Sequence, residues 1–521
     1  MRRSAVLVAL AAVASHAPAL RNGFTWLDHG DLEAGAALAS PAQWLSLFTH
    51  GYARTGFYRP LTALSLSVDA LAGAPWLFHA TNLVLHAAAA VAVLFMASLV
   101  LERSPAVATT AGVLFAVHPV TSVVANQLTY RGDALMTLGL MVMLVGQARR
   151  RPLLAVSGLL LAALSKETGL VLGPLLALGW VASLPRERWR AEGASLLAVG
   201  GGLLAALALR LAFAPAWHVQ NPALSALEFV GTRLASLGKS ALALLAPVDP
   251  RVCDAFPVTL PWQPLALLGL GVGLALLVLA VRARPLGLWL GLALAPSLSL
   301  VPVPRFWSPH YLYLPLAFAG VLAAEALERT GRRWALQLLW AACAVLAVVS
   351  FVDSRRYRDD GALFGTELEG RAERREAQLY FGDARRAAGD LAAAAAAYRA
   401  AVTRTPGVIA YSDELAALQN LGLVQLQQEQ YLEAELTFLE ALERPHDERR
   451  GRELNHDLAA VALARGDPGG AEALLRAEAA RSDAFPESLA LFARALHALG
   501  RDDEARAVLE RKAATAPSPP R

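Results

Sequence analysis

A change in character near residue 352 constrains the fold of this chain more than any other feature. Residues 1–352 form a succession of long apolar stretches, whereas residues 371–515 are polar, charged and rich in helix-forming residues. Hydrophobic residues make up 56% of the chain and charged residues 17%, which departs from the average soluble protein. The sequence therefore predicts an all-α protein in which a polytopic membrane domain precedes a soluble helical domain.

The apolar stretches have the length of membrane-spanning helices, which need about 20 residues. We predict about eleven spans in the membrane domain 1–352, and two of them are short. The predicted spans are 4–20, 80–101, 106–125, 134–147, 152–165, 169–184, 194–213, 263–281, 286–303, 312–328 and 334–352. Long outer loops are expected at 21–79 and 214–262. The pair His118-Pro119 falls inside the third span, and the proline is expected to kink it.

Arginines mark one side of this domain. Short loops rich in Lys and Arg face the cytoplasm in membrane proteins. With eleven spans, one side carries Arg2, Arg3, Arg103, Arg149, Arg150, Arg151, Arg186, Arg188, Arg190, Arg282, Arg284, Arg329, Arg332 and Arg333. The two long loops and the C-terminal domain then lie on the extracytoplasmic side, as in a bacterial inner-membrane protein. An endoplasmic reticulum protein has the same pattern. The segment up to Ala17 also resembles a cleavable signal peptide, and either interpretation places 21–79 outside.

A repeated spacing of small and large residues runs through the C-terminal domain. Gly382, Ala394, Tyr398 and Ala401 stand at offsets 0, 12, 16 and 19, and Gly422, Ala434, Phe438 and Ala441 repeat them. Copies starting at Ala459 and Ala493 repeat the first three offsets only. This spacing is typical of tetratricopeptide repeats, which present a concave surface to a protein or peptide, although an Ala-rich helical bundle is the alternative. We predict a linker at 353–370, the repeat domain at 371–515 and a disordered tail at 516–521.

Acidic residues follow the first span in the outer loop 21–79. A carboxylate held where a span meets the interface is suited to act as a general base. Asp28 comes directly after the aromatic residues Phe24 and Trp26 and is the candidate for this role. Asp31 and Glu33 are more simply interpreted as parts of a solvated loop.

Cationic residues recur in the other outer connections. Arg59 follows Tyr58 before an amphipathic stretch, and an arginine there can bind a phosphate with two hydrogen bonds or extend toward lipid head groups. Arg131 and Asp133 lie at the outer end of another span and can simply pair with each other. Lys166, in the turn between two short spans, can likewise pair with other loops.

Histidines and an asparagine form a polar stripe in the second span. His79, Asn82 and His86 are spaced by three and four residues, which places them on one helical face. His118 adds a polar group to the third span. Polar groups inside a membrane are costly, so the stripe is either a ligand site or an interhelical hydrogen-bond network.

Several classes of site are absent from the sequence. It contains no zinc-ligand spacing, no phosphate-binding glycine loop and no Ser–His–Asp motif. The two cysteines, Cys253 and Cys343, give no disulfide framework, and no charged tail is long enough to suggest nucleic acid. The basic and aromatic residues of the outer loops are instead typical of a site that binds the phosphate of a lipid, at a surface in contact with membrane lipids. We predict neither a cofactor nor a metal site.

These residues occur in an ordered set of short strings. They are Phe24-Thr25-Trp26-Leu27-Asp28-His29, Tyr58-Arg59-Pro60-Leu61, Phe78-His79 through Asn82 to His86, Leu114 through His118-Pro119 to Val120, Arg131-Gly132-Asp133, Leu164-Ser165-Lys166-Glu167 and Tyr311 to Pro315. The set, followed by repeats, resembles the transmembrane-and-tetratricopeptide O-mannosyltransferase-like proteins, membrane glycosyltransferases of the GT-C class. The resemblance covers nearly the whole chain.

The resemblance implies a fold and a reaction. The fold is a GT-C-like membrane domain followed by a tetratricopeptide solenoid. A polyprenyl-phosphate-linked sugar, mannose in the typical case, would be transferred to a Ser or Thr hydroxyl of an exported protein. Asp28 would be the base, and Arg59 and Arg131 would contact the lipid phosphate with help from Lys166. The other substrate-binding candidates are Tyr58, His79, His118 and Asp133.

Two departures and two rival functions accompany this resemblance. Leu27 stands where the family often has a first acid, and Pro309-His310 stands where an acid and an arginine are common. One rival is a non-enzymatic scaffold in which the spans only anchor the repeats. The other is a transporter of lipid-linked glycans, which predicts charged groups along a midplane path, for which His118 and Asp69 are the few candidates.

Overall fold

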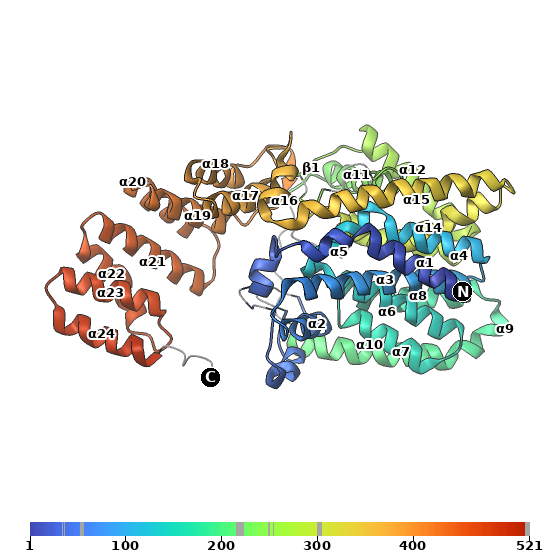
Figure 1. Cartoon of the computed structure of the whole chain (residues 1–521), viewed down its shortest axis with the longest axis horizontal. Helices are drawn as coiled ribbons and strands as arrows, with labels where there is room; N and C mark the ends of the chain where they lie inside the picture. The colour runs from blue at the N-terminus through green and yellow to red at the C-terminus, as the bar shows by residue number, and fades with distance from the viewer. Residues whose placement is uncertain are drawn as a thin grey trace. The chain divides into compact units, whose positions relative to one another are not determined.

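The computed structural model describes residues 1–33, 35, 37–52, 57–214, 223–247, 251–253, 255–299 and 305–515, so the predicted disordered tail lies outside the described residues. The chain divides into two compact units (Figure 1). Unit 1 is Met1–Glu367 with Gly407–Ile409, and unit 2 is Leu368–Pro406 with Ala410–Arg521. The predicted limits of the linker, 353 and 370, lie on either side of this division and stay predictions of domain extent.

Unit 1 is helical almost throughout. Its helices are α1 (Arg2–Ser15), α2 (Pro60–Ala70), α3 (Pro75–Leu99), α4 (Pro105–Val117), α5 (Ser122–Asn126), α6 (Arg131–Ala148), α7 (Pro152–Ala163), α8 (Glu167–Ser183), α9 (Arg186–Trp189), α10 (Gly193–Phe213), α11 (Ala226–Leu245), α12 (Pro264–Arg282), α13 (Leu286–Leu294), α14 (Tyr313–Glu328), α15 (Arg333–Ser354) and α16 (Asp360–Leu368). Short helical turns are η1 (Ala17–Arg21), η2 (His29–Glu33), η3 (Pro41–Phe48), η4 (Pro119–Thr121), η5 (Leu128–Tyr130), η6 (Arg190–Glu192), η7 (Ala295–Leu298), η8 (Pro309–Leu312) and η9 (Arg355–Arg358). The strands β1 (Ala255–Pro257) and β2 (Val408–Ala410) form a two-stranded sheet.

Six helices within the described residues are long and apolar enough to cross a membrane. They are Pro75–Leu99, Leu128–Ala148, Arg186–Phe213, Pro264–Arg282, Pro309–Glu328 and Trp334–Arg358. A seventh candidate joins Pro105–Val117 to Pro119–Asn126 with a bend of 53°, which confirms the kink expected at the proline. A helix overlaps each of the eleven predicted spans. Because several of these helices are short, the number of spans stays a prediction.

Helices α6 and α7 approach closely through glycines and lie side by side in Figure 1. A Cβ atom on Gly139 would lie 2.6 Å from the carbonyl oxygen of Gly158, and one on Gly146 would lie 2.5 Å from the backbone nitrogen of Ala155. Side chains larger than hydrogen are therefore excluded from this contact. Small residues let membrane helices pack backbone against backbone, and here they fix α6 and α7 as one hairpin.

The outer loop predicted at 214–262 contains a 20-residue helix, α11. Its inner face includes Thr232, which accepts a hydrogen bond from the backbone nitrogen of Thr259 at 3.0 Å. Its outer face exposes apolar side chains, including Leu227, Phe229 and Leu245. The sequence prediction missed this helix because Arg233 and Lys239 interrupt its apolar pattern. An amphipathic helix of this kind is suited to the membrane interface.

Unit 2 consists of four consecutive helical hairpins (Figure 1). Their helices are α17 (Arg375–Ala387) with α18 (Leu391–Val402), α19 (Glu414–Gln427) with α20 (Tyr431–Leu442), α21 (Glu448–Ala464) with α22 (Pro468–Ala479), and α23 (Pro486–Ala498) with α24 (Asp502–Thr515). A Cβ on Gly382 would lie 2.6 Å from the ring of Tyr398, and one on Gly422 would lie 2.6 Å from the ring of Phe438. The repeated small and large residues therefore mark where two helices cross. Leu509, at the large position of the last copy, is exposed, and the tetratricopeptide assignment stays a prediction.

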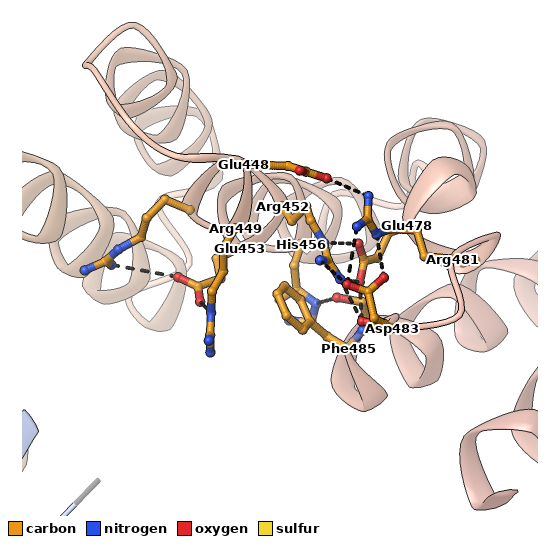
Figure 2. A network of polar contacts seen from close by, with 12 residues as sticks. Glu448, Arg449, Arg452, Glu453, His456, Glu478, Arg481, Asp483 and Phe485 are labelled. Atoms are coloured by element: carbon orange, nitrogen blue, oxygen red, sulfur yellow. Dashed lines mark hydrogen bonds and ion pairs between the residues drawn. The ribbon is translucent and has the colours of Figure 1, made fainter. Parts of the chain in front are cut away.

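Charged side chains hold the turn that leaves one hairpin of unit 2, as Figure 2 shows for α21, α22 and the turn after α22. Arg452 donates to both carboxylate oxygens of Glu478, at 2.6 and 2.8 Å, and to Asp483 at 3.0 Å. Glu478 also accepts the backbone N–H of Phe485 at 2.7 Å. One arginine thus fixes the path of the chain from one hairpin to the next.

Candidate functional site

Asp28 is fully buried in the outer loop that follows η1. The backbone N–H of Thr129 donates to its Oδ1 at 3.2 Å, while Oδ2 has no hydrogen-bond partner among the described residues. Burial raises the pKa of Asp28 well above the ordinary value, against the lowering effect of its backbone hydrogen bonds. The group therefore holds a proton more readily than a surface aspartate, and one of its oxygens is left without a hydrogen-bond partner among the described residues.

Hydrogen bonds hold the loop that carries Asp28 against the segment that carries Thr129. Thr25 and Gln127 exchange hydrogen bonds: the Thr25 hydroxyl donates to Oε1 at 3.2 Å, and Nε2 donates to the Thr25 carbonyl at 2.8 Å. Asn22 donates to Asn126 at 3.1 Å. Since these segments are about 100 residues apart in sequence, the pairing could not be read from either string alone.

Arg131 lies at the start of α6 and is fully buried. Its Nε donates to Asn82 at 2.6 Å, its Nη2 donates to the carbonyl of Phe78 at 2.9 Å, and its Nη1 is paired with Asp69 at 2.6 Å. Each nitrogen is engaged, and the carboxylate partner is Asp69 rather than Asp133. The expected pairing of Arg131 with Asp133 is therefore not formed. The sequence did offer one hint of this partner: Asp69 is the lone acidic residue in the apolar stretch that forms α2.

Asp133 is paired with Lys166 instead. Lys166 Nζ donates to the two carboxylate oxygens at 2.5 and 2.6 Å, and both residues are buried. The pair joins the first turn of α6 to the turn between α7 and α8. Lys166 therefore pairs with another segment of the chain, as one of the two interpretations of the sequence expected.

Arg59 precedes α2 and lies beside a cavity. Its Nε and Nη2 donate to the carboxylate of Glu167 at 3.0 and 2.9 Å, and its guanidinium lies 3.9 Å from the ring centre of Phe57. Nη1 makes no hydrogen bond within the described part of the chain. The cavity wall comes from η3, the turn after it and the start of α2, and includes Gln43, Ser46, His50, Tyr52 and Arg59. Arg59 is thus a cation that keeps a donor for a ligand.

Tyr58 is buried next to Arg59, and its hydrogen bonds are all to groups of the chain itself. Its hydroxyl donates to the carbonyl of Phe48 at 2.8 Å, and its backbone N–H donates to Glu167 at 3.0 Å. Tyr52 donates to Asp31 at 3.0 Å, so the same loop is also tied to the acidic stretch after Asp28. Burial raises the pKa of Asp31. Asp31 is thus half-buried and hydrogen-bonded, so it is less solvated than we expected.

The histidines predicted as ligands contact backbone carbonyls. His79 Nε2 lies 3.3 Å from the oxygen of Gly23, and His118 Nε2 lies 3.2 Å from the oxygen of Leu244 at the end of α11. His86 bridges Tyr313, at 2.8 Å, and a carbonyl of α4. These contacts favour the interhelical network over a ligand site. The described residues hold no group of three or more potential metal ligands.

Aromatic rings pack together beside the two chain segments that hold Asp28, the one around Trp26 and the one around Tyr130. Tyr130 stacks on His310 with ring centres 4.2 Å apart, and its ring centre is 5.7 Å from that of Trp26. The guanidinium of Arg305 lies 4.6 Å from the Trp26 ring centre. His310, where the sequence departs from the expected acid and arginine, is therefore part of this wall. The arrangement combines a buried carboxylate, a cation and flat aromatic surfaces.

Comparisons with known proteins give one structural likeness. No family model matches the chain, and no curated protein matches it significantly. Among solved structures, the chain is similar to the crystal structure of ArnT from Cupriavidus metallidurans bound to undecaprenyl phosphate. The identity is 15% and the TM-score is 0.39, with 96% of this chain and 88% of that chain covered. A TM-score of this size does not establish a shared fold, so the function has to be argued from the residues of this chain.

Proposed function

We propose that this chain is a membrane glycosyltransferase of the GT-C type. It would move a sugar, mannose in the case we favour, from a polyprenyl-phosphate donor to a Ser or Thr hydroxyl of an exported protein on the extracytoplasmic face. The observation that carries the proposal is Asp28: a buried carboxylate with one unpartnered oxygen. It lies near Trp26 in the chain, is hydrogen-bonded to the residue before Tyr130, and interacts electrostatically with the buried Arg131.

The reaction is a single displacement. The acceptor hydroxyl oxygen attacks the anomeric carbon, the bond from that carbon to the phosphate oxygen breaks, and Asp28 takes the hydroxyl proton. The polyprenyl phosphate leaves with the bonding electrons. A base with a raised pKa is well matched to a proton that becomes acidic only as the new bond forms. The departing phosphate requires positive charge nearby, and that requirement needs no nucleotide.

Arg59 is the cation best placed to bind the donor phosphate. Its Nη1 is available beside a polar cavity, while Glu167 holds the other two nitrogens and fixes the plane of the guanidinium. Arg131 is fully engaged by Asp69 and Asn82, so its contribution is the positive charge and the fixed position of α6 rather than a direct hydrogen bond. Lys166 acts in the same way through Asp133.

The helical hairpins of unit 2 serve in this proposal to recruit the protein acceptor. Hairpin arrays of the tetratricopeptide type present a continuous surface for an extended segment of a partner. The C-terminal unit would lie outside the cytoplasm, on the same side as Asp28, in a bacterial inner membrane. The non-enzymatic scaffold is the rival function, and it needs the same recruitment without the chemistry.

The test is glycan mass spectrometry on exported proteins from cells that express the intact chain, Asp28→Asn, or no chain. Hexose on Ser or Thr is expected in the first case only. Glu33→Gln is the matched control, because Glu33 is an exposed acid in the same loop. A scaffold predicts that Asp28→Asn leaves glycosylation unchanged. If hexose is lost only in cells without the chain, glycosylation depends on the protein but Asp28 is not the base.

The pH dependence gives a second readout on purified protein in lipid nanodiscs. A general base acts in its ionised form, so transfer is expected to rise with pH through the pKa of Asp28, which burial raises well above the usual aspartate value. An ordinary aspartate would be ionised throughout the neutral range and would leave the rate flat there. A rate that falls as pH increases would contradict Asp28 as the base.

A further inference from the structure

Asp360, the first residue of α16, holds the loop on both sides of Asp28. Its Oδ1 accepts the backbone N–H of Trp26 at 2.8 Å. Its Oδ2 lies 2.7 Å from Nε2 of His29. One carboxylate thus bonds the residue two positions before Asp28 and the residue directly after it, although it lies more than 300 residues away in sequence.

The contact at Trp26 matters because its backbone is held in an unusual conformation. Trp26 has φ of +57°, a left-handed conformation that a bulky residue rarely adopts. Such a residue persists only when its surroundings hold it there. The indole is almost fully buried and meets the ring of Phe364, one turn along α16, edge to face with centres 6.3 Å apart. Helix α16 therefore supports both the backbone and the ring of Trp26.

The chain just before α16 makes further contacts with the same loop. The carbonyl of Arg358 accepts the N–H of Gly23 at 3.1 Å, and the carbonyl of Ser354 accepts from Asn22 at 3.0 Å. A Cβ on Gly23 would lie only 3.2 Å from the Arg358 oxygen. The segment from the end of α15 to the start of α16 thus runs along the loop that carries Asp28.

The other end of α16 is fixed as well. Glu367 is buried, and its carboxylate accepts the backbone N–H groups of Val252 and Cys253 at 3.0 and 3.2 Å. Arg356 is paired with the same carboxylate at 2.6 Å. Since both ends are held, α16 is a rigid support, and the chain passes directly from it into unit 2 at Leu368.

We propose that Asp360 is a positioning residue that sets the place of the Asp28 carboxylate. The inference rests on the proposed function for its catalytic consequence, and its structural part stands apart from it. The hydrogen bond that His29 donates to Asp360, with a smaller contribution from the one to Glu33, raises the pKa of His29 to about 9. The imidazole is therefore charged at neutral pH, and its bond to Asp360 is charge-assisted.

The experiment compares Asp360→Ala and Asp360→Asn with the intact chain and with Glu33→Gln, all as full-length protein in nanodiscs. Glu33→Gln removes the other, more exposed carboxylate on the same histidine. Amide hydrogen exchange of the 22–33 segment is expected to speed up about 10- to 100-fold in Asp360→Ala, the loss expected for charge-assisted hydrogen bonds. Asp360→Asn, which keeps an oxygen for Trp26, should lose less. Protection in α3 should stay unchanged and reports that the variants fold.

The transfer rate supplies the catalytic readout. With saturating donor and acceptor, kcat is expected to fall about tenfold or more in Asp360→Ala while KM changes little, because the base is displaced rather than the binding groups. Faster exchange at 22–33 with no transfer by the intact chain would reject the proposed function and leave the support by α16 in place. Unchanged exchange at 22–33 in Asp360→Ala would overturn the inference. So would an effect of Glu33→Gln equal to that of Asp360→Ala.

Discussion

Unit 1 and unit 2 both contain many pairs of cations and carboxylates, and one pair from each unit shows the two extremes of exposure. Lys166 and Asp133 in unit 1 are only 10% and 4% exposed. Arg506 and Asp503 in unit 2 are 72% and 95% exposed. Water can replace either partner of the second pair and neither partner of the first. A charged pair is therefore a fixed structural link where it is buried and a weak surface contact where it is exposed. Unit 2 also has a buried pair, Arg452 with Glu478, at 14% and 6% exposure.

This difference shows what the membrane environment does to polar groups. A buried charge that loses its partner is not solvated by water, so each buried pair of unit 1 is costly to break. Three such pairs meet around the candidate site, and each joins segments that are distant in sequence: Arg131 with Asp69, Lys166 with Asp133, and Arg59 with Glu167.

Breaking the buried pair should have the largest effect. Lys166→Met leaves the Asp133 carboxylate buried without a partner, and we expect a loss of about 3–5 kcal/mol of stability. The measurement is the thermal unfolding midpoint of the full chain in nanodiscs. The double variant Lys166→Met with Asp133→Leu removes both charges and should recover most of the loss. A single variant as stable as the intact chain would show that water reaches this pair.

Asp457 in α21 is an intermediate case, because it is a buried acid of unit 2 whose partner is a neutral side chain rather than a cation. Gln419 donates to it at 2.7 Å, and burial raises its pKa to about 6. A raised pKa means that the stability from its protonated form is complete below pH 4 and is lost as pH rises through 6. At pH 8, Asp457→Asn should therefore be more stable by about 2 kcal/mol. Amide exchange of α21 at pH 5 and pH 8 measures this, and a pH-independent difference would contradict it.

The exposed pair should show the smallest effect. Arg506→Gln removes one side of an i,i+3 contact on α24, and we expect a change below about 1 kcal/mol that disappears in high salt. Local amide exchange of α24 at two salt concentrations is the measurement. A loss as large as that of Lys166→Met would remove the distinction between the two units.

The helices were easier to predict from the sequence than the contacts between them. Apolar runs located a helix at every predicted span, since hydropathy reports the cost of placing a segment in lipid. The offsets that begin at Gly382 and Gly422 located two hairpin crossings, because a glycine faces a large ring at each. In contrast, we did not predict α11, because Arg233 and Lys239 interrupt its apolar sequence pattern.

The candidate site was predictable in its residue types but not in its partners. The sequence singled out Asp28, Arg59, Arg131 and Lys166. It did not show that Arg131 selects Asp69, which is 62 positions away, over Asp133, which is two positions away and on a different face of the helix. Asp360 gave no signal at all, because its role comes from the return of α16 to the first outer loop.

The glycine contact between α6 and α7 has a consequence for how the protein enters a membrane. Helix α7 has 12 residues and is about 18 Å long, which is shorter than the roughly 30 Å of hydrocarbon that a lone span must cross. Its packing against the longer α6 supplies what its own length lacks. The insertion machinery should therefore release the two helices into lipid as a single hairpin. A bulky side chain at Gly146 would then act during biogenesis, because α7 would fail to insert into the membrane together with α6.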